Sequence, residues 1–223
     1  MLTLAKSFDD AVQYRLSVSD LRDLSGNAST SGMSQKVASL LPVIQMPEVH
    51  SFDGTSDGID KGEELLAEPG SAGARMPVGA DAPWTINVFV WVDRTPADLT
   101  TFAGFGNDAD ISRTQRYIVK MHNKIAFWGS NVDEGTNAAC DVGKWQMLTA
   151  TYSGTTLRIY KNASLLKTAE IDLTDAAPIA RLAPPGPWQE AHRFKGKLAG
   201  FAIWDRELDE DGIARLMRTM PAQ

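Results

Sequence analysis

The sequence predicts an all-β protein, built as one antiparallel sandwich of two sheets with one short C-terminal helix. Segments rich in Val, Ile, Phe, Tyr and Trp alternate with Gly, Asp, Asn and Pro along almost the whole chain, and helix signals are scarce. A length of 223 residues is common for an all-β domain with a single core. We therefore expect one domain.

The predicted strands are short and are separated by turn residues. In residues 84–92 one parity is entirely apolar and the other changes from polar to aromatic, which predicts a central strand with both faces covered at one end. In residues 156–161, Leu157 and Ile159 should face the core and Arg158 the solvent or a groove. The predicted strands are residues 12–18, 43–52, 84–92, 99–105, 116–122, 124–128, 145–152, 156–162, 165–171 and 197–204.

A helix is predicted over residues 209–218. Asp209 can cap it, acidic residues occupy its first turn and arginines lie near its end. One apolar stripe runs along it, formed by Ile213, Leu216, Met217 and Met220. We expect this helix to dock on the sandwich rather than on a membrane surface, because its polar face is not predominantly basic.

Two segments fall outside the predicted sandwich strands. Residues 1–11 form an N-terminal extension before a domain that spans residues 12–223. Residues 63–83 are poor in strand formers and predict a long exposed loop. A loop of this length is typical of a functional or assembly contact.

Composition argues against several kinds of partner and location. A formal net charge of -6 without a basic run argues against nucleic acid. Neither a run of 18 apolar residues nor a signal-peptide pattern is present, so we expect no membrane insertion and no standard secretion. Cys140 is the single cysteine, so the fold must depend on core burial without an internal disulfide.

Three groups of segments together carry a family resemblance. The first is DLSGN at residues 23–27 with SFDGTSDGI at residues 51–59. The second is the tryptophan strand at residues 143–152 with the hairpin strand at residues 156–162. The third is FKGKLAGFAIWDREL at residues 194–208. In this order they resemble the laminin-G-like jelly-roll domains of the concanavalin A-like lectin/glucanase superfamily, over roughly residues 12–218.

The resemblance implies a jelly-roll sandwich, and it departs from the family at one turn. Ala163 stands where the family usually has Gly, and Ala resists the positive φ that a tight hairpin turn requires. The superfamily includes lectins, glycosidases, adhesion modules and virion proteins, so the fold alone does not specify the function.

We predict no catalytic residues. Glu170 and Asp172 are the nearest match to the paired carboxylates of a glycosidase, but they lie at the end of a hairpin, where solvent-facing carboxylates are the simpler interpretation. The three histidines, His50, His122 and His192, lack the spacing of a zinc site and are interpreted as surface residues. Cys140 has no positively charged neighbour in the sequence that would activate it.

Two acidic clusters are candidate binding sites. Asp53, Asp57 and Asp60 offer hard oxygen ligands for a structural calcium ion, and the alternative is that they only form Asp-Gly turns. The predicted loop at residues 129–143 is a second candidate, because loops at the ends of a sandwich often bind ligands. Its ligand-binding candidates are Asn131, Asp133 and Asp141, beside Glu134 and Asn137.

Two tryptophans receive different interpretations. Trp188 lies in a proline-rich segment, where an exposed ring can stack on a sugar or anchor a partner protein, and the alternative is a lid folded back over the core. Trp128 closes an apolar strand and is predicted to be a core residue.

Two non-catalytic functions remain open from the sequence, and a glycoside hydrolase is a less favoured third alternative. The first is a structural or assembly protein, a virion-surface decoration or fibre-associated subunit of a bacteriophage, made in the cytoplasm and acting on the virion or outside the cell with neighbouring subunits as partners. The second is a carbohydrate-binding, lectin-like module of an exported protein. The two overlap, because a virion protein can also bind glycans.

Overall fold

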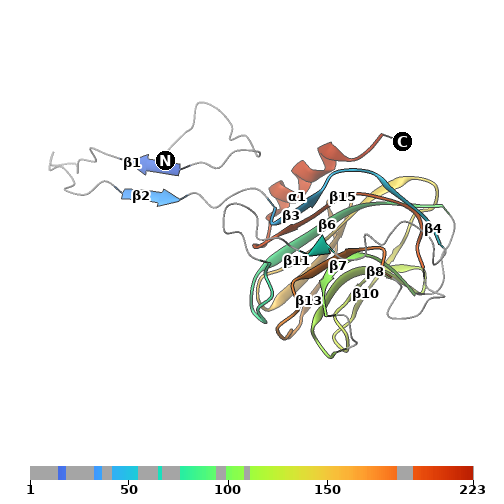
Figure 1. The fold of residues 1–223 in the computed structure, drawn as a ribbon, viewed down its shortest axis with the longest axis horizontal. Helices are drawn as coiled ribbons and strands as arrows, with labels where there is room; N and C mark the ends of the chain where they lie inside the picture. The colour runs from blue at the N-terminus through green and yellow to red at the C-terminus, as the bar shows by residue number, and fades with distance from the viewer. Residues whose placement is uncertain are drawn as a thin grey trace. The chain divides into compact units, whose positions relative to one another are not determined.

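The strand pattern of the sequence forms two antiparallel sheets that enclose a common core (Figure 1). The computed structural model describes residues 15–18, 33–36, 42–54, 65–66, 76–93, 99–107, 111–184 and 193–222. The chain divides into two compact units, Met1–Pro42 and Val43–Gln223, and the sandwich belongs to the second. The boundary predicted after residue 11 lies outside the described residues.

The first unit contains a two-stranded antiparallel sheet of its own. Strand β1 (Arg15–Val18) pairs with β2 (Met33–Lys36). The strand predicted at residues 12–18 is therefore found in part, but it pairs within the first unit and is not a strand of the sandwich sheets.

One sheet of the sandwich has seven strands, in the order β13-β12-β11-β6-β15-β3, with β4 also paired to β15. The central position predicted for residues 84–92 is confirmed, since β6 lies between β11 and β15 and eight of its nine residues are buried. The strands are β3 (Ile44–Met46), β4 (His50–Asp53), β6 (Trp84–Val92), β11 (Trp145–Tyr152), β12 (Thr156–Lys161), β13 (Ser164–Glu170) and β15 (Lys195–Trp204).

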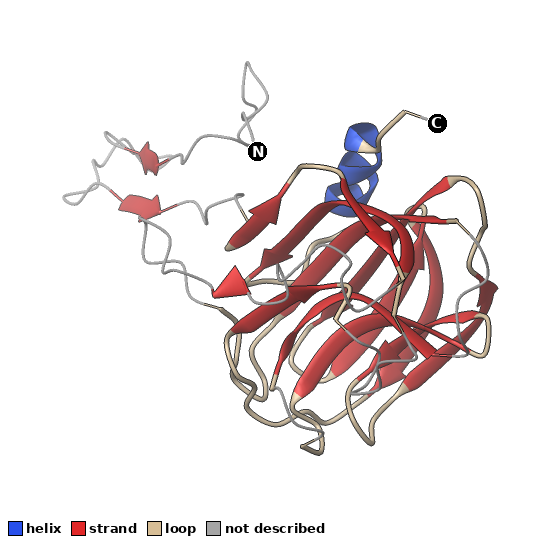
Figure 2. Ribbon diagram, turned by 45° about the vertical axis from the view of Figure 1, so that its right-hand side comes forward, coloured by secondary structure: helices blue, strands red, loops and turns tan. Residues whose placement is uncertain are grey.

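The other sheet has six strands, in the order β10-β9-β8-β7-β14-β5. Figure 2 shows the two sheets as two layers of strands. The strands of the second sheet are β5 (Leu65–Leu66), β7 (Leu99–Gly106), β8 (Gln115–Met121), β9 (Lys124–Trp128), β10 (Glu134–Ala139) and β14 (Ile179–Leu182).

The structure differs from the predicted strands at four places. The strand predicted at residues 43–52 is split into β3 and β4 around Pro47, which has no N–H to donate to a ladder. Strand β10 lies inside the predicted end loop, and β14 was not predicted. Strand β5 lies inside the loop predicted at residues 63–83, of which residues 63–64 and 67–75 lie outside the described part.

The core between the sheets is aromatic at the end where β6 begins. Trp84 stacks on Phe127 and Tyr152, with ring centroids 5.8 and 5.6 Å away, and meets Phe105 edge-on at 6.2 Å. Leu157 and Ile159 face this core as predicted. Because these rings come from both sheets, they join the two layers directly.

The predicted C-terminal helix is confirmed as α1 (Glu210–Leu216), followed by a 3-10 turn over Met217–Thr219. Asp209 caps it, its Oδ1 accepting from the Gly212 N–H at 2.7 Å. Ile213 is fully buried in a second apolar cluster on the outer side of the seven-stranded sheet, which also contains Trp145. The helix therefore covers part of that sheet away from the central core (Figure 2).

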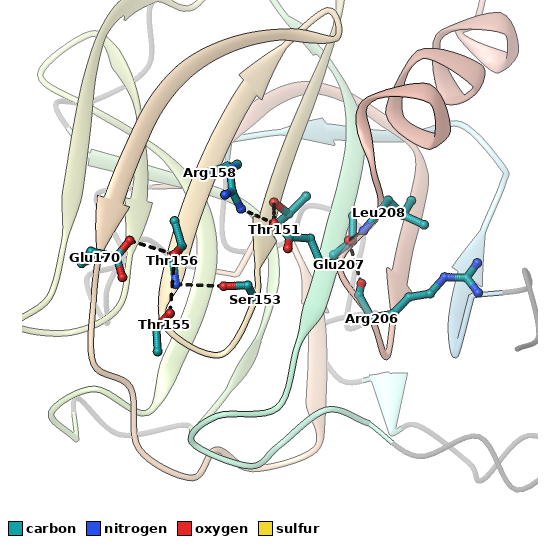
Figure 3. A network of polar contacts seen from close by, with 10 residues as sticks. Thr151, Ser153, Thr155, Thr156, Arg158, Glu170, Arg206, Glu207 and Leu208 are labelled. Atoms are coloured by element: carbon teal, nitrogen blue, oxygen red, sulfur yellow. Dashed lines mark hydrogen bonds and ion pairs between the residues drawn. The ribbon is translucent and has the colours of Figure 1, made fainter.

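A polar network fastens the segment between β15 and α1 to the seven-stranded sheet (Figure 3). Glu207 accepts hydrogen bonds from Arg158 of β12 and from Thr151 of β11. The Thr85 hydroxyl donates to the Arg206 carbonyl at 2.8 Å and accepts from the Leu208 N–H at 2.9 Å. Arg158 thus lies opposite the core as predicted, but it is half-buried and paired.

The hairpin turn between β12 and β13 has the positive φ values that Ala163 was expected to resist. Asn162 and Ala163 both have positive φ, 50° and 62°, which is the two-residue hairpin turn that favours Asn-Gly. Asn162 offsets part of the strain, because its Oδ1 accepts from the Met147 N–H at 2.8 Å. Ala163 adopts the left-handed region without such a side-chain bond.

Candidate functional site

The predicted acidic end loop is shorter than expected and is held by its own side chains. Asp133 accepts from the backbone N–H groups of Gly129 at 2.8 Å and Ser130 at 3.0 Å. Ser130 and Asn131 have positive φ values of 59° and 67°, so this capping carboxylate holds a tight turn. Asn131 is exposed at the tip of the turn, directly after β9.

Asp141, the third predicted ligand residue of this loop, is engaged within the chain. Its carboxylate lies 2.9 Å from the Lys161 ammonium and 3.4 Å from that of Lys144. Burial alone would raise the pKa of Asp141, but the hydrogen bonds and charges of the two lysines lower it below the ordinary value. The carboxylate therefore links the start of β11 to the end of β12.

The proposed calcium ligands are described only in part. Asp53 lies exposed at the end of β4, whereas Asp57 and Asp60 lie outside the described residues, as do Trp188 and His192. In the described part of the chain, no three His, Cys, Asp or Glu side chains come together as a metal-holding group. Calcium binding by these aspartates stays a prediction.

The two carboxylates considered for catalysis contact different partners. Glu170 accepts from the Thr156 hydroxyl at 2.8 Å (Figure 3). Asp172 forms an ion pair of 2.7 Å with Arg113. Each carboxylate therefore helps to hold its own segment of chain.

Cys140, His122 and His50 are the other titratable residues considered from the sequence. Cys140 is buried, and desolvation raises the pKa of its thiol to about 12, so the reactive thiolate is disfavoured. His122 is exposed in the turn between β8 and β9 with a φ of 47°. His50 is half-buried on β4, and its Nε2 is buried without a hydrogen-bond partner among the described residues.

Trp128 lies where the sequence did not predict it. In β9, Ile125 and Phe127 face the core, so Ala126 and Trp128 face the outer side of the six-stranded sheet. Trp128 is half-buried there and is not a core residue. Its ring N–H donates to Gln115 Oε1 at 2.7 Å, which fixes the orientation of the indole across two neighbouring strands.

The outer side of the six-stranded sheet carries an apolar cluster around this indole, which we call the Trp128 face. Strand β8 contributes Tyr117 directly opposite Trp128, and the next cross-strand pair on the same face is Val119 with Ala126. Both strands therefore present apolar side chains on their outer parity as well as toward the core. The Trp128 face consists of Leu99, Gln115, Tyr117, Val119, Met121, Ala126 and Trp128.

A glycine on β7 shapes the neighbouring part of this face. Gly104 pairs with Tyr117 on one side and with Arg181 of β14 on the other, so the row continues across four strands. A Cβ at Gly104 would lie 2.6 Å from Tyr117 Cδ1, which shows that the tyrosine ring lies against the glycine backbone. The Tyr117 hydroxyl is buried, and no group in the described part of the chain forms a hydrogen bond with it.

The exposed part of the Trp128 face is amphipathic. Trp128, Leu99 and Met121 are half-buried and so keep part of their apolar surface accessible, while Asn131 is exposed on the turn that follows Trp128. An indole with a fixed orientation offers a flat apolar surface, and the exposed amide of Asn131, three residues later in the chain, can donate and accept hydrogen bonds. This arrangement suits a ligand that has both C–H and hydroxyl groups.

The sequence contained a signal for this face. Tyr117, Ile118 and Val119 are consecutive apolar residues, which predicts a strand that is covered on both faces rather than on one. The pairing of Trp128 with Tyr117 depends on the two-residue turn of His122 and Asn123, which fixes the register of β8 and β9.

Comparison with known proteins places the fold in a family. The Laminin_G_3 family model, described as concanavalin A-like lectin/glucanases superfamily, matches residues 70–214. No curated protein matches the sequence significantly. No described helix is long and apolar enough to cross a membrane.

Two solved structures illustrate the similarity. The CBM40 domain of the Ruminococcus gnavus IT-sialidase, known free and bound to alpha2,3 sialyllactose, has a TM-score of 0.59 and 14% identity over 79% of this chain and 99% of that chain. Domain 4 of AbnA, a GH43 extracellular arabinanase from Geobacillus stearothermophilus, in complex with arabinotriose, has a TM-score of 0.51 and 16% identity, covering 76% of this chain and 87% of that chain. At such identities the likeness establishes the fold.

Proposed function

The chain belongs to the concanavalin A-like lectin/glucanase superfamily, and on this basis we propose that it is a non-catalytic module that binds a glycan at the Trp128 face. The observation that carries the proposal is the half-buried Trp128, whose indole is held by Gln115 on the outer side of a sheet. The two similar structures described above are of domains bound to oligosaccharides, which supports this class of ligand.

Sugar binding has a physical basis at this face. One side of a pyranose or furanose ring presents C–H groups that pack on an aromatic surface, while its hydroxyls form hydrogen bonds to amides and water. Because Gln115 already fixes the indole, binding would not require ordering of that side chain. Asn131, which is exposed three residues after Trp128, offers an amide for these hydroxyls.

The non-catalytic part of the proposal rests on the carboxylates. Glu170 ends β13 of the seven-stranded sheet, and Asp172 follows it and pairs with Arg113, so neither carboxylate belongs to the Trp128 face of the six-stranded sheet. We expect that the protein does not hydrolyse β-glucans and that replacing Glu170 and Asp172 by Ala changes no activity. Hydrolysis by the wild type that is lost in this double variant would establish an enzyme instead.

The binding test uses two tryptophans on opposite sheets. A glycan array identifies a ligand, and titration calorimetry then compares the wild type with Trp128→Ala. Losing one aromatic stacking partner should weaken binding at least about tenfold. Trp91→Ala is the matched control, because Trp91 is also half-buried but lies on the outer side of the seven-stranded sheet. Equal weakening in both variants, with unchanged folding, would refute the Trp128 face as the site.

An assembly role, as a virion-surface subunit of a bacteriophage, is a second proposal and is compatible with glycan binding. The observation that favours a partner is the separate unit Met1–Pro42, which contains its own two-stranded sheet outside the sandwich. We expect the chain to bury this unit against a neighbouring subunit. Sedimentation of the full chain with candidate particles, beside a chain that begins at Val43, tests this role, and equal binding by both chains would contradict it.

A further inference from the structure

A buried glutamine connects Trp128 to the end of a neighbouring strand. Gln115 is the first residue of β8 and has no exposed surface. Its Oε1 accepts from the Trp128 ring N–H at 2.7 Å, and its Nε2 donates to the Asn107 carbonyl at 3.4 Å. The two ends of one side-chain amide therefore have different partners, one on β9 and one directly after β7.

These two partners allow the Gln115 amide only one orientation. An indole N–H can only donate a hydrogen bond, and a backbone carbonyl can only accept one. A half-turn of the amide would place its NH2 group against the indole N–H and its oxygen against the carbonyl. Both hydrogen bonds would then be lost at a buried position, where unmade bonds are costly. The Asn107 carbonyl therefore determines which end of the amide meets Trp128.

Asn107 is itself held by the segment between β13 and β14. Its side-chain Oδ1 accepts from the Ala177 N–H at 2.7 Å. The preceding residue, Gly106, pairs with Gln115, and a Cβ at Gly106 would lie 2.9 Å from Gln115 Cα. A glycine is needed here because any side chain would push the end of β7 away from β8. A continuous network of hydrogen bonds thus runs from Ala177 to Trp128.

The network matters because an indole can turn about its second side-chain torsion. This torsion is broad and roughly two-fold for aromatic side chains, so a half-buried ring has more than one available orientation. Only one of them directs the Trp128 N–H at Gln115. Without this hydrogen bond the ring would exchange between orientations and would present different edges to a ligand.

We propose that Gln115 is a positioning residue of the Trp128 face, and that Asn107 fixes the Gln115 amide in the orientation that holds the indole. Gln115 has no exposed surface, so it acts through Trp128 and does not contact a ligand. A ring that is already ordered loses less conformational freedom on binding. The expected effect on affinity rests on the proposed glycan function, whereas the expected effect on the indole does not.

The first test compares the NMR signals of the indole N–H groups in the full-length wild type and in Gln115→Met, without any ligand. Methionine keeps an unbranched side chain of similar length and removes the amide. The Trp128 signal, assigned with Trp128→Phe, should move upfield, and its proton should exchange faster with solvent because the hydrogen bond is gone. An unchanged Trp128 signal in Gln115→Met would overturn the proposal.

Gln146→Met is the matched control for the loss of a buried glutamine. Gln146 lies on β11 of the other sheet, has no exposed surface, and forms two hydrogen bonds with the backbone of Asp141. Both variants should lose a similar free energy of unfolding, because each loses the two hydrogen bonds of a buried amide. Only Gln115→Met should change the Trp128 signal. An equal change in both variants would indicate a general loss of structure and would contradict a positioning role.

Two variants of Asn107 test the rest of the network. Asn107→Ala removes the acceptor for the Ala177 N–H, and Asn107→Asp keeps it. The Trp128 signal should move in Asn107→Ala in the same direction as in Gln115→Met, but by less. It should return to the wild-type position in Asn107→Asp. A wild-type signal in Asn107→Ala would contradict the role assigned to Asn107.

Titration calorimetry with the glycan identified on the array measures the consequence for binding. Gln115→Met should weaken binding by about three- to tenfold, the effect of having to order one large side chain, and Gln146→Met should bind like the wild type. Wild-type affinity in Gln115→Met, together with weakened binding in Trp128→Ala, would overturn this inference and leave the glycan proposal standing. If no glycan binds the wild type, the glycan proposal fails, and the Trp128 signal in Gln115→Met still decides whether the network positions the indole.

Discussion

Replacing Glu207 tests how the C-terminal segment is fastened to the sandwich. Glu207 lies between β15 and α1 and holds two strands of the seven-stranded sheet through Arg158 and Thr151. Glu207→Ala removes both contacts, whereas Glu207→Gln keeps an acceptor oxygen and removes only the charge. We expect both variants to fold, with the alanine variant less stable.

The expected magnitude follows from the exposure of the pair. The Arg158 and Glu207 side chains keep 34% and 29% of their surfaces exposed, so the ion pair is intermediate between a surface pair and a buried one. We assign it a coupling of about 1 kcal/mol, at the upper end for exposed pairs. The Thr151 hydrogen bond, 3.1 Å long, adds about 1 kcal/mol. Glu207→Ala should therefore cost about 2 kcal/mol, and Glu207→Gln about half of that.

The assay is urea unfolding followed by tryptophan fluorescence in a double-mutant cycle with Arg158→Ala. The double variant should be more stable than the sum of the two single changes predicts, by about 1 kcal/mol at low salt and by less in 1 M sodium chloride. Additive effects at low salt, within about 0.3 kcal/mol, would refute the ion pair as a fastening contact.

Three further predictions concern the cap, the thiol and one ion pair. Asp209→Ala should destabilise the sandwich by about 1 kcal/mol, because the Gly212 N–H loses the carboxylate that caps it. Urea unfolding midpoints measure this loss, with Asp211→Ala as an exposed control on the same turn. Cys140 should react with a thiol reagent at pH 8 only after unfolding, and rapid labelling of the native chain would contradict its burial. Because the pKa of Asp141 is lowered in the folded chain, its contribution to stability is present above the unfolded pKa and is lost as the pH falls through the folded pKa. Asp141→Asn should therefore flatten the acid side of the stability profile below about pH 4. An unchanged profile would contradict this prediction.

The sequence predicted the elements whose own residue pattern indicates how they are buried. Strand β6 has one fully apolar parity, and α1 has both a cap and an apolar stripe, so each contains its own signal. Strand β10, with the sequence EGTNAA, has no such pattern, because it is an edge strand that forms by pairing with β9. Strand propensity alone could not identify it.

The site was harder to predict than the strands. Both parities near Trp128 are apolar, so the sequence did not show which parity faces the core, and the ring was assigned to the wrong side. The contact between Trp128 and Gln115 depends on the register across the His122–Asn123 turn. Arg116 could not be recognised as buried, because a charged residue in a strand is normally assigned to the solvent face.

The most direct test of glycan binding at the Trp128 face is NMR of the indole N–H groups during titration with a glycan identified on the array. The chain has six tryptophans, and the Trp128 and Trp91 signals can be assigned with Trp128→Phe and Trp91→Phe. We predict that the Trp128 signal shifts and saturates with the ligand while the Trp91 signal does not move. A saturating shift of other indoles with Trp128 unchanged would contradict the proposed site.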